Sequence, residues 1–382
     1  MFMEKVNNQN ITSPNPSFDL FDKAQSHSER SRGGEKEGYT AVIPPLAKGR
    51  LGGVIDLSII IVSYKSKDHL AVLLPSIFGS KGLEFVGAGL ARPLADDFRA
   101  AEARPYTAEI FIVDNDSRDG TIEWLEESFF RGREKSSPLQ IVKNINNGFS
   151  AGNNLGIKNS SGKYILLLNP DTKVEPETFE VMLDFMESRP DVGISGCKLI
   201  KADGKLDLAC RRRFPNPWNS FKRLFLRDNQ NYNYTDIDEN QSMEVDSVVG
   251  AFLLIRRVGY IGESENQIAG TSDFRLPTSD YLDEDFFMYG EDLDLCWRCK
   301  QAGFKVWYYP KTIVTHYKGE SSRKEPFVML KAFHNSMWIF YKKHYYKKYP
   351  FFLNWLVFCG IYFRFGALVF INLFKADPRV SR

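Results

Sequence analysis

Two adjacent carboxylates, Glu291 and Asp292, stand between a run of aromatic residues and a predicted helix in the stretch FFMYGEDLDLCWR. Aromatic side chains favour burial and carboxylates favour water or a partner, so placing them together has a cost that a functional site can offset. Leu293, Cys296 and Trp297 share one helical face, which predicts a helix that begins near Asp292. The pair therefore predicts either a helix cap or a base that accepts a proton from a hydroxyl group, and the two roles are compatible.

Polar side chains also follow two predicted strands at the point where each strand ends. Asp114 and Asn115 follow one apolar run, and their side chains can hydrogen-bond the edge of a nucleobase or close an Asx-turn. Asn169 and Asp171 follow another apolar run. A carboxylate there can hold Mg²⁺ or Mn²⁺, which draw their remaining ligands from substrate phosphates, or it can end the strand in a turn.

The stretch NNGFSAGNNLGI, residues 146–157, combines glycines with amides at a predicted helix start. Gly148 and Gly152 allow a ligand to approach the backbone, and Asn153 and Asn154 add hydrogen-bond donors. Helix N-termini favour phosphate, but the lysine of a GxxxxGK[ST] loop is missing. The stretch predicts either a phosphate-binding loop or a capped loop.

Alternating strands and helices must position these residues. Continuous apolar runs predict buried strands, and periodic segments between them predict helices. The predicted strands lie within residues 54–66, 109–116, 139–144, 163–171, 192–200, 245–257 and 304–310. The predicted helices lie within residues 68–78, 120–130, 150–161, 176–190 and 292–302. This alternation predicts an α/β fold with a mostly parallel sheet, whose ligands sit at the carboxyl ends of the strands.

Composition restricts the class of protein. The chain has 382 residues and a formal net charge of +2, which gives no electrostatic case for nucleic acid as a partner. Five cysteines are too few for a disulfide framework, and the Cys296–Cys299 pair has no second pair to complete a zinc site. Residues 1–52 are polar, lack the apolar segment of a secretory signal, and predict a disordered tail.

The C-terminal segment, residues 323–382, is basic and aromatic and contains the apolar stretch 351–374. The stretch approaches the length of a membrane span, but Arg364 near its middle makes insertion costly. Three alternatives are a span, an interfacial or re-entrant helix pair, and a helix pair that packs on the preceding domain. Lysines beside the aromatic residues favour an anionic membrane surface as a partner.

Seven stretches together resemble the family 2 glycosyltransferases, which have the GT-A fold, and the pattern is most similar to the rhamnosyltransferase-like branch. In chain order they are SIIIVSYKS, FIVDNDSRDGT, NNGFSAGNNLGI, YILLLNPDTKV, GAFLLIRR, DEDFFMYGEDLDLCWR and FKVWYYPKTIVTHYKGESS. The resemblance implies a catalytic domain over residues 53–322. Residues 79–107 and 263–280 depart from the family pattern and predict inserted loops.

The resemblance implies a role for each matching position. Residues that would line the nucleotide-sugar site are Ser63, Tyr64, Asp114, Asn115, Asn147, Gly148, Asn153, Asn154 and Asn169. Asp171 would bind Mg²⁺ or Mn²⁺, with His316 as a further metal or phosphate contact, although the Asp-x-Asp pattern reads Asn169-Pro170-Asp171. Asp292 would be the catalytic base, and Glu291 would contact the acceptor or support the structure. Phe286, Phe287 and Tyr289 would form a wall for the acceptor.

These roles imply an inverting, metal-dependent transferase in cell-surface glycan synthesis. The implied donor is a nucleotide sugar, with dTDP-rhamnose as the leading candidate, and the acceptor is a lipid-linked glycan or a polysaccharide. The C-terminal segment would hold the enzyme at the cytoplasmic face of the cell membrane. The alternative is a catalytically degenerate GT-A protein that acts as a membrane scaffold or glycan-binding module. A sugar nucleotidyltransferase is disfavoured because SYKSKDHL stands where that class has a Gly-rich, Arg-containing loop.

Overall fold

The apolar runs form one large sheet in the computed structural model, which describes residues 55–86, 105–130, 139–226, 230–257, 281–317 and 326–374. The strands are β1 (Leu57–Ser63), β2 (Leu83–Phe85), β3 (Tyr106–Asn115), β4 (Leu139–Asn144), β5 (Tyr164–Leu168), β6 (Thr172–Val174), β7 (Val192–Lys201), β8 (Met243–Glu244), β9 (Phe252–Arg256) and β10 (Lys305–His316). The tail at 1–52, the loop at 263–280 and most of the loop at 79–107 lie outside the described residues.

The sheet is mostly parallel, as predicted. Its order is β2-β3-β1-β5-β9-β7-β10-β6, with β4 paired to β3 and β8 paired to β10. β1, β3, β5, β7 and β10 run in one direction, and β9 lies antiparallel between β5 and β7. Every residue of β1 is buried, which accounts for its uninterrupted apolar run. The parallel strands thus bring their carboxyl ends, and the polar residues that follow them, to one edge of the sheet.

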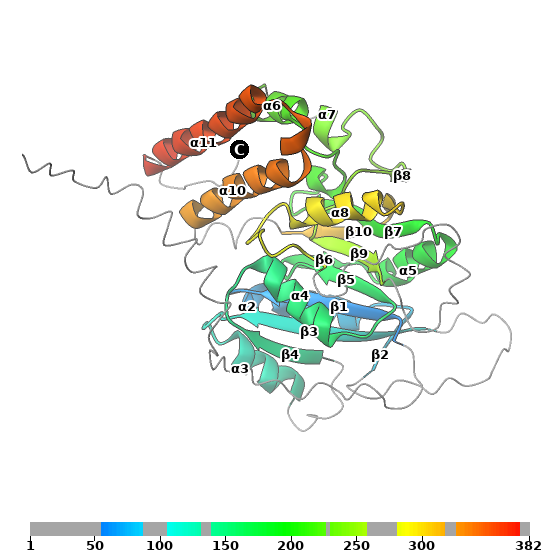
Figure 1. Ribbon diagram of the computed structural model, residues 1–382. Helices are drawn as coiled ribbons and strands as arrows, with labels where there is room; N and C mark the ends of the chain where they lie inside the picture. Colours follow the sequence, from blue (N-terminus) through cyan, green and yellow to red (C-terminus); the bar gives the residue numbers. More distant parts are fainter. Residues whose placement is uncertain are drawn as a thin grey trace, which may run out of the picture. The chain divides into compact units, whose positions relative to one another are not determined.

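Helices flank the sheet (Figure 1). Those of the sheet domain are α2 (Lys67–Phe78), α3 (Thr121–Leu125), α4 (Phe149–Asn159), α5 (Thr178–Ser188), α6 (Pro217–Phe225), α7 (Gln230–Asn233) and α8 (Glu291–Gln301). Short helical turns occupy Glu126–Phe130 and Leu208–Cys210. α4 packs on β1 and β3, whereas α5 and α8 pack on β7 and β10. One continuous apolar core fills the space between these helices and the sheet.

Several elements differ from the prediction. β2 forms inside the segment predicted as an inserted loop, where Phe85 packs edge-to-face on Phe78 of α2 at a ring distance of 5.2 Å. β6 and α6 were not predicted from the pattern, because β6 has three residues and α6 is preceded by a proline-rich stretch. β10 extends past Pro310 to His316, and its register against β7 shifts between Tyr308 and Ile313.

Two long helices form an antiparallel hairpin at the C-terminal end: α10 (Pro326–His344) and α11 (Phe351–Leu373), joined through the turn Tyr346–Lys348. α10 docks on the sheet domain, where Ser336 Oγ donates to the Met288 carbonyl oxygen at 2.9 Å and His344 Nε2 lies 2.8 Å from Asp294 Oδ1. α11 packs on α10, for example through the edge-to-face pair Trp338–Phe358. The hairpin therefore follows the surface of the domain (Figure 1).

Candidate active site

The adjacent carboxylates Glu291 and Asp292 lie at the N-terminus of α8. Gly290 precedes the helix with a φ of 86°, in the left-handed region that favours glycine, and turns the chain into Glu291 and Asp292. No side chain caps this end. Both carboxylates are buried at the positive end of the helix dipole. Capping therefore does not explain why they are here.

Asp292 is held mainly by groups outside its own helix. Its Oδ2 atom accepts hydrogen bonds from Arg212 Nη2 at 2.8 Å and from the Gly250 amide at 3.0 Å, while Oδ1 accepts from the Leu293 amide at 2.7 Å. Burial works against the charge on Arg212, but Asp292 outweighs it and raises the Arg212 pKa. A carboxylate offers about four acceptor positions, so these three donors leave room for a substrate hydroxyl.

Glu291 has a different environment from its neighbour. Its side chain is buried, and its Oε2 atom has no hydrogen-bond partner in the described part of the chain. Burial, followed by the nearby Asp292 charge, raises the pKa of Glu291 to about 8. Glu291 is therefore protonated at neutral pH and does not compete with Asp292 for a proton.

A second charged cluster lies where β5 and β10 end. His316 Nε2 is 3.4 Å from Asp171 Oδ1, and its Nδ1 is 3.0 Å from Asp207 Oδ2. Burial favours the neutral imidazole, but the two carboxylates outweigh burial and raise the pKa of His316 to about 9. Burial likewise tends to raise the pKa of Asp171, yet His316 holds it below its usual value. Asp207 fixes the ring so that Nε2 points toward Asp171.

The residues around Asp171 fit a divalent cation. Asn169 Oδ1 is buried without a hydrogen-bond partner among the described residues, two positions before Asp171. An amide oxygen, a carboxylate and an imidazole nitrogen form a donor set that suits Mg²⁺ or Mn²⁺, with phosphate oxygens completing the coordination. Asp207 would then act on His316 from the far side of the ring, the usual second contact of a metal-binding histidine. No cluster of three His, Cys, Asp or Glu residues with metal-binding geometry occurs in the described ranges.

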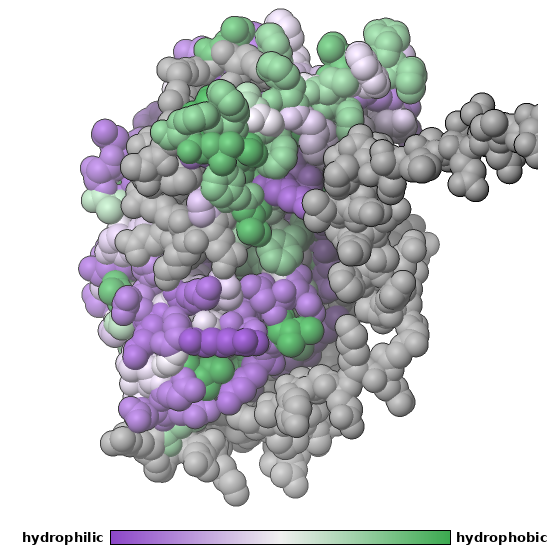
Figure 2. All heavy atoms as spheres, turned by 90° about the vertical axis from the view of Figure 1, so that its left-hand side faces the viewer, coloured by the Kyte–Doolittle hydropathy of each residue, from purple (hydrophilic) through white to green (hydrophobic). Residues whose placement is uncertain are grey.

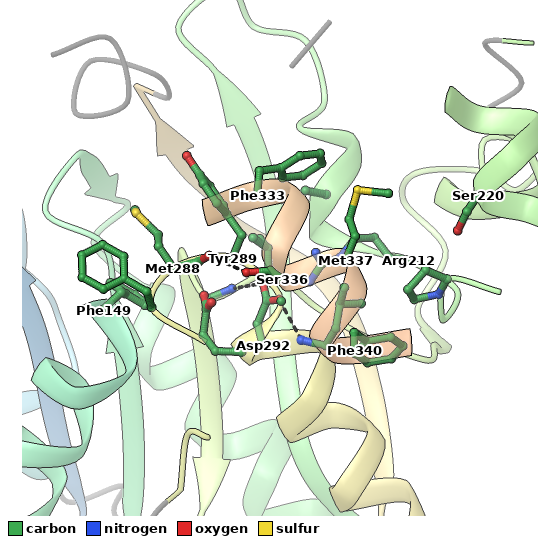
Figure 3. Close-up of a pocket in the computed structure, with 18 of the residues that line it drawn as sticks. Phe149, Arg212, Ser220, Met288, Tyr289, Asp292, Phe333, Ser336, Met337 and Phe340 are labelled. Carbon is green, nitrogen blue, oxygen red and sulfur yellow. Dashed lines mark hydrogen bonds and ion pairs between the residues drawn. The ribbon is translucent and has the colours of Figure 1, made fainter. Parts of the chain in front are cut away.

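One cleft joins the two clusters. It has a volume of about 960 Å³, and its walls include Asn169, Asp171 and His316 as well as Glu291 and Asp292. Figure 3 shows Asp292 between the loop that carries Met288 and Tyr289 and the helix that carries Phe333 and Phe340. Asp171 and Asp292, both predicted as site residues from the sequence, therefore face the same cleft.

The predicted nucleotide-binding residues divide into two groups. Tyr64 and Asn115 line the cleft, whereas Ser63 and Asp114 do not. The Asp114 carboxylate accepts hydrogen bonds from the hydroxyl and the amide of Ser117, three residues on, and burial raises the pKa of Asp114. Ser63 Oγ is buried and has no hydrogen-bond partner in the part of the chain described.

The segment at the start of α4 lines the cleft at Asn146, Gly148 and Phe149. Gly148 lines the cleft, but Asn147, Asn153 and Asn154 do not. Asn153 Nδ2 donates to the Phe149 carbonyl oxygen at 2.9 Å. Asn154 Nδ2 donates to the Leu282 carbonyl oxygen at 2.7 Å, and its Oδ1 accepts from the Leu282 amide at 2.9 Å. Asn153 therefore bonds within α4, whereas Asn154 ties α4 to the segment that leads into α8.

The aromatic residues before α8 also divide. Phe286 is fully buried in a small cluster with Leu293 and Phe340, so the expectation that it lines an acceptor wall is wrong. Phe287 and Tyr289 do line the cleft. Phe286 instead packs against Leu293 of α8 and Phe340 of α10, whereas Phe287 is 40% exposed.

Sequence reasoning missed two charged residues of the site, Arg212 and Asp207. Arg212 is 80 positions from its partner Asp292, and Asp207 is 109 positions from His316. Both precede α6 in a stretch without strong periodicity. Three basic residues in succession, Arg211 to Arg213, were the available signal, because an unbroken basic run beside buried segments needs partners.

A mostly parallel sheet with a carboxylate cluster on each side of one cleft is the architecture expected of a GT-A glycosyltransferase. The family model described as Glycosyl transferase family 2 matches residues 58–257, and the chain belongs to that family. The predicted family and fold are thereby confirmed.

Individual relatives agree with the predicted branch. The N-acetylglucosaminyl-diphospho-decaprenol L-rhamnosyltransferase of Mycobacterium tuberculosis is 25% identical over 279 residues, covering 66% of this chain and 80% of that protein. Rhamnosyltransferase WbbL of Escherichia coli is 27% identical over 187 residues, covering 46% of this chain and 63% of that protein. Among solved structures, S. aureus TarS 1-349 aligns with a TM-score of 0.44 at 13% identity, covering 85% of this chain and 75% of that one.

Proposed function

We propose that this glycosyltransferase moves a sugar, with inversion, from a nucleotide sugar to a hydroxyl of a lipid-linked or polysaccharide acceptor. The observation that supports the proposal is the single cleft that joins Asp171 and His316 to Asp292. A nucleotide sugar needs its diphosphate and its anomeric carbon in one cavity with a base on the far side. The cleft provides these two regions in one space.

The reaction follows from the two clusters. The acceptor oxygen attacks the anomeric carbon, its proton passes to Asp292, and the bond between that carbon and the diphosphate oxygen breaks with the electron pair leaving on the diphosphate. Arg212 and the Gly250 amide fix the carboxylate so that its free acceptor position stays directed at the cleft. Asn169, Asp171 and His316 would hold Mg²⁺ or Mn²⁺, which when bound neutralises the developing charge of the leaving group.

The proposed donor is dTDP-rhamnose, from which L-rhamnose is transferred, and the preferred acceptor is a lipid-linked glycan. The support is similarity to two rhamnosyltransferases, one of which carries a diphospho-decaprenol acceptor in its name. The proposed activity belongs to the synthesis of a cell-envelope polysaccharide.

The helical hairpin supports a location at the cytoplasmic face of the membrane. α11 is the one helix in the described ranges that is long and apolar enough to cross a bilayer, and little of it is buried. It nevertheless packs along α10, which is docked on the sheet domain, so we propose that α11 lies in the membrane interface. Figure 2 shows hydrophobic residues gathered on the part of the surface where the hairpin lies.

Lysines of the hairpin support contact with anionic lipid only in part. Lys331, Lys342 and Lys347 are exposed and have no ion-pair partner among the described residues, so they remain available to an anionic surface. Lys343 instead pairs with Asp283 and Asp285. Arg323 and Lys324 lie outside the described residues.

A transfer assay on the full chain tests the function. With dTDP-rhamnose, Mn²⁺ and a polyprenyl-diphosphate-linked sugar, we expect transfer, and we expect Asp292→Asn to slow it by roughly 10²–10⁴-fold, the usual contribution of a general base. Binding of dTDP, measured by thermal shift, should persist in the variant. Asp203→Asn, a matched change at an exposed turn that does not line the cleft, should leave the rate unchanged.

The same assay distinguishes the proposed transferase from the alternative, a catalytically degenerate scaffold. A folded Asp292→Asn protein that keeps the wild-type rate, or a wild-type protein that transfers no sugar from any nucleotide donor, would contradict the proposal. A melting curve of Asp292→Asn is needed beside it, because the change leaves the buried Arg212 charge unpaired and lowers stability.

A further inference from the structure

The cleft continues beyond Asp292 into a chamber between α6, α10 and α11. Its walls are apolar there. The residues are Trp218 and Phe221 of α6, Met329, Phe333 and Met337 of α10, and Leu353, Leu356, Val357 and Ile361 of α11. Such walls favour a hydrocarbon chain, because its apolar surface is removed from water there.

Two guanidinium groups face this apolar chamber. Arg364 of α11 lines it and donates from Nη1 to His334 Nε2 at 2.7 Å. His334 is fully buried, and its Nδ1 must donate to the Leu330 carbonyl oxygen at 2.8 Å, so Nε2 carries the accepting lone pair. Burial lowers the pKa of His334 to about 4, and the imidazole is therefore neutral and leaves the Arg364 charge uncompensated.

Arg223 of α6 adds a second uncompensated charge. Its guanidinium stacks on the Tyr232 ring at 4.2 Å, and it lines the same chamber. Within the described residues, neither Arg223 nor Arg364 has a carboxylate within ion-pair distance. Burial, followed by the charge of Arg223, lowers the pKa of Arg364.

Other buried arginines have carbonyl, hydroxyl or carboxylate partners among the described residues, although the Nε atoms of Arg211 and Arg212 have none. Arg211 donates to two backbone carbonyl groups, and Arg212 pairs with Asp292. Arg256 donates to backbone carbonyl groups and to Tyr164. Arg223 and Arg364 differ from these in lining the cleft without an ion-pair partner among the described residues. An unneutralised cation pair in an apolar chamber is costly unless an anion joins it.

We propose that Arg364 and Arg223 bind the diphosphate of a lipid-linked acceptor, whose isoprenoid chain lies along the apolar walls of α10 and α11. The assignment rests on the proposed function and specifies its acceptor. Planar guanidinium forks match phosphate oxygens in pairs, and a diphosphate can bridge two of them. The chamber opens into the cleft that holds Asp292, so a sugar attached to this diphosphate would lie toward the base.

The position of Arg364 explains its presence in an apolar helix. It interrupts the longest hydrophobic stretch of the chain, where a charge is unfavourable against lipid. Its side chain is turned to α10 and the chamber, while Phe363 beside it is 73% exposed. α11 thus presents one face to α10 and the chamber, and another face, which carries Phe363, is exposed.

Binding of geranyl diphosphate, a short soluble probe, tests the site on the full chain. With excess dTDP and Mn²⁺ present to fill the donor site, we expect calorimetry to show tighter binding of geranyl diphosphate than of geraniol or inorganic diphosphate. Arg364→Gln and Arg223→Gln should each weaken geranyl diphosphate binding by about tenfold, since each removes charge-assisted hydrogen bonds. Binding of geraniol should not change in either variant.

Controls keep the result specific. Arg189→Gln, at an exposed ion pair outside the cleft, should bind geranyl diphosphate like the wild type. Phosphatidylglycerol vesicles should bind both cleft variants as they bind the wild type, because the proposal assigns these arginines to the acceptor. An equal loss of vesicle binding would instead identify a membrane headgroup contact and overturn the assignment.

The outcomes also separate this site from the proposed reaction. Unchanged geranyl diphosphate affinity in folded Arg364→Gln and Arg223→Gln proteins, or an unchanged KM for the lipid-linked acceptor, overturns the site and leaves the transferase intact. Failure of every nucleotide sugar to react overturns the transferase, while a loss of probe binding in the variants would still support the anion site. If Arg364→Gln does not fold, Arg223→Gln alone tests the binding site.

Discussion

Adjacent carboxylates acquire different properties from their partners at the start of α8. Asp292 receives a guanidinium and two backbone amides, whereas Glu291 has a buried oxygen to which no described residue donates a hydrogen bond. The Asp292 carboxylate thus has three hydrogen-bond donors, whereas Glu291 Oε2 has none among the described residues. This contrast allows one carboxylate to serve as a base while the other remains a neutral acid.

Glu291 makes stability depend on pH. The folded state binds its proton with a pKa of about 8, against an ordinary value of 4.5, so the stabilising contribution is complete below about pH 4.5 and is lost as the pH rises through about 8. Glu291→Gln keeps the shape and cannot ionise. We therefore expect the variant to gain stability relative to the wild type between pH 5 and pH 8, by at most about 1.4 kcal/mol per pH unit.

Urea unfolding at intervals from pH 5 to pH 9 measures this difference. Glu123→Gln, the same change on the exposed side of α3, should run parallel to the wild type at every pH. Parallel curves for Glu291→Gln as well would mean that Glu291 is ionised throughout and that its environment is more polar than its burial indicates.

The sequence predicted the residues that follow strands and missed those that reach across the fold. Asp171 and Asp292 stood out because each ends an apolar run or starts a helix, which is a local signal. Arg212 and Asp207 act on partners far along the chain, and only the folded sheet brings them together. Asn153 and Asn154 had a local signal too, but their side chains bind neighbouring backbone away from the cleft.

At the scale of elements, the loop before α4 is fastened to the segment before α8. The Phe149 amide donates to the Phe287 carbonyl oxygen at 2.7 Å, and Ser150 Oγ donates to the Phe286 carbonyl oxygen at 2.7 Å. Gly148 has a φ of 102°, and a Cβ atom there would lie 2.5 Å from the Phe287 carbonyl oxygen. Only glycine allows the two segments to approach this closely.

Gly148→Ala should therefore separate the two segments that form one wall of the cleft. We expect a loss of roughly 1–3 kcal/mol in the free energy of unfolding, typical of overpacking, and weaker donor binding in a thermal-shift titration. Gly366→Ala is the matched control, because nothing lies within 4 Å of its added Cβ atom in α11 and alanine favours a helix. A Gly148→Ala protein as stable as the wild type would show that the loop adapts without cost.

Elements with a strong period or an unbroken apolar run were predictable, and elements defined by pairing were not. β1 and β5 are buried along their full length, so their composition alone identified them. β6 depends on antiparallel pairing with β10, and β2 depends on parallel pairing with β3. α6 has a proline at its first position and an asparagine cap, which resemble a turn in the sequence until the helix forms.

At the scale of the molecule, the cleft connects the strand ends with the C-terminal hairpin. The Asp171 end suits a diphosphate donor, the middle contains Asp292, and the far end is lined by α10 and α11. The hairpin is therefore both a wall of the cleft and the most hydrophobic surface of the described chain (Figure 2). An acceptor held in a membrane could enter the cleft from this side without leaving its lipid environment.

This arrangement makes membrane binding depend on the outer face of α11. Phe363 and Phe370 are 73% and 64% exposed, and burial of one such side chain is worth roughly 1.5–3 kcal/mol. We expect Phe363→Ser combined with Phe370→Ser to reduce co-sedimentation of the full chain with phosphatidylglycerol vesicles by at least about tenfold, while transfer to a short-chain soluble acceptor is retained. Val72→Ser, at an exposed position of α2 remote from the hairpin, should leave vesicle binding unchanged. Equal sedimentation of the double variant and the wild type would exclude α11 as the membrane contact and leave the exposed lysines as the remaining source of attraction.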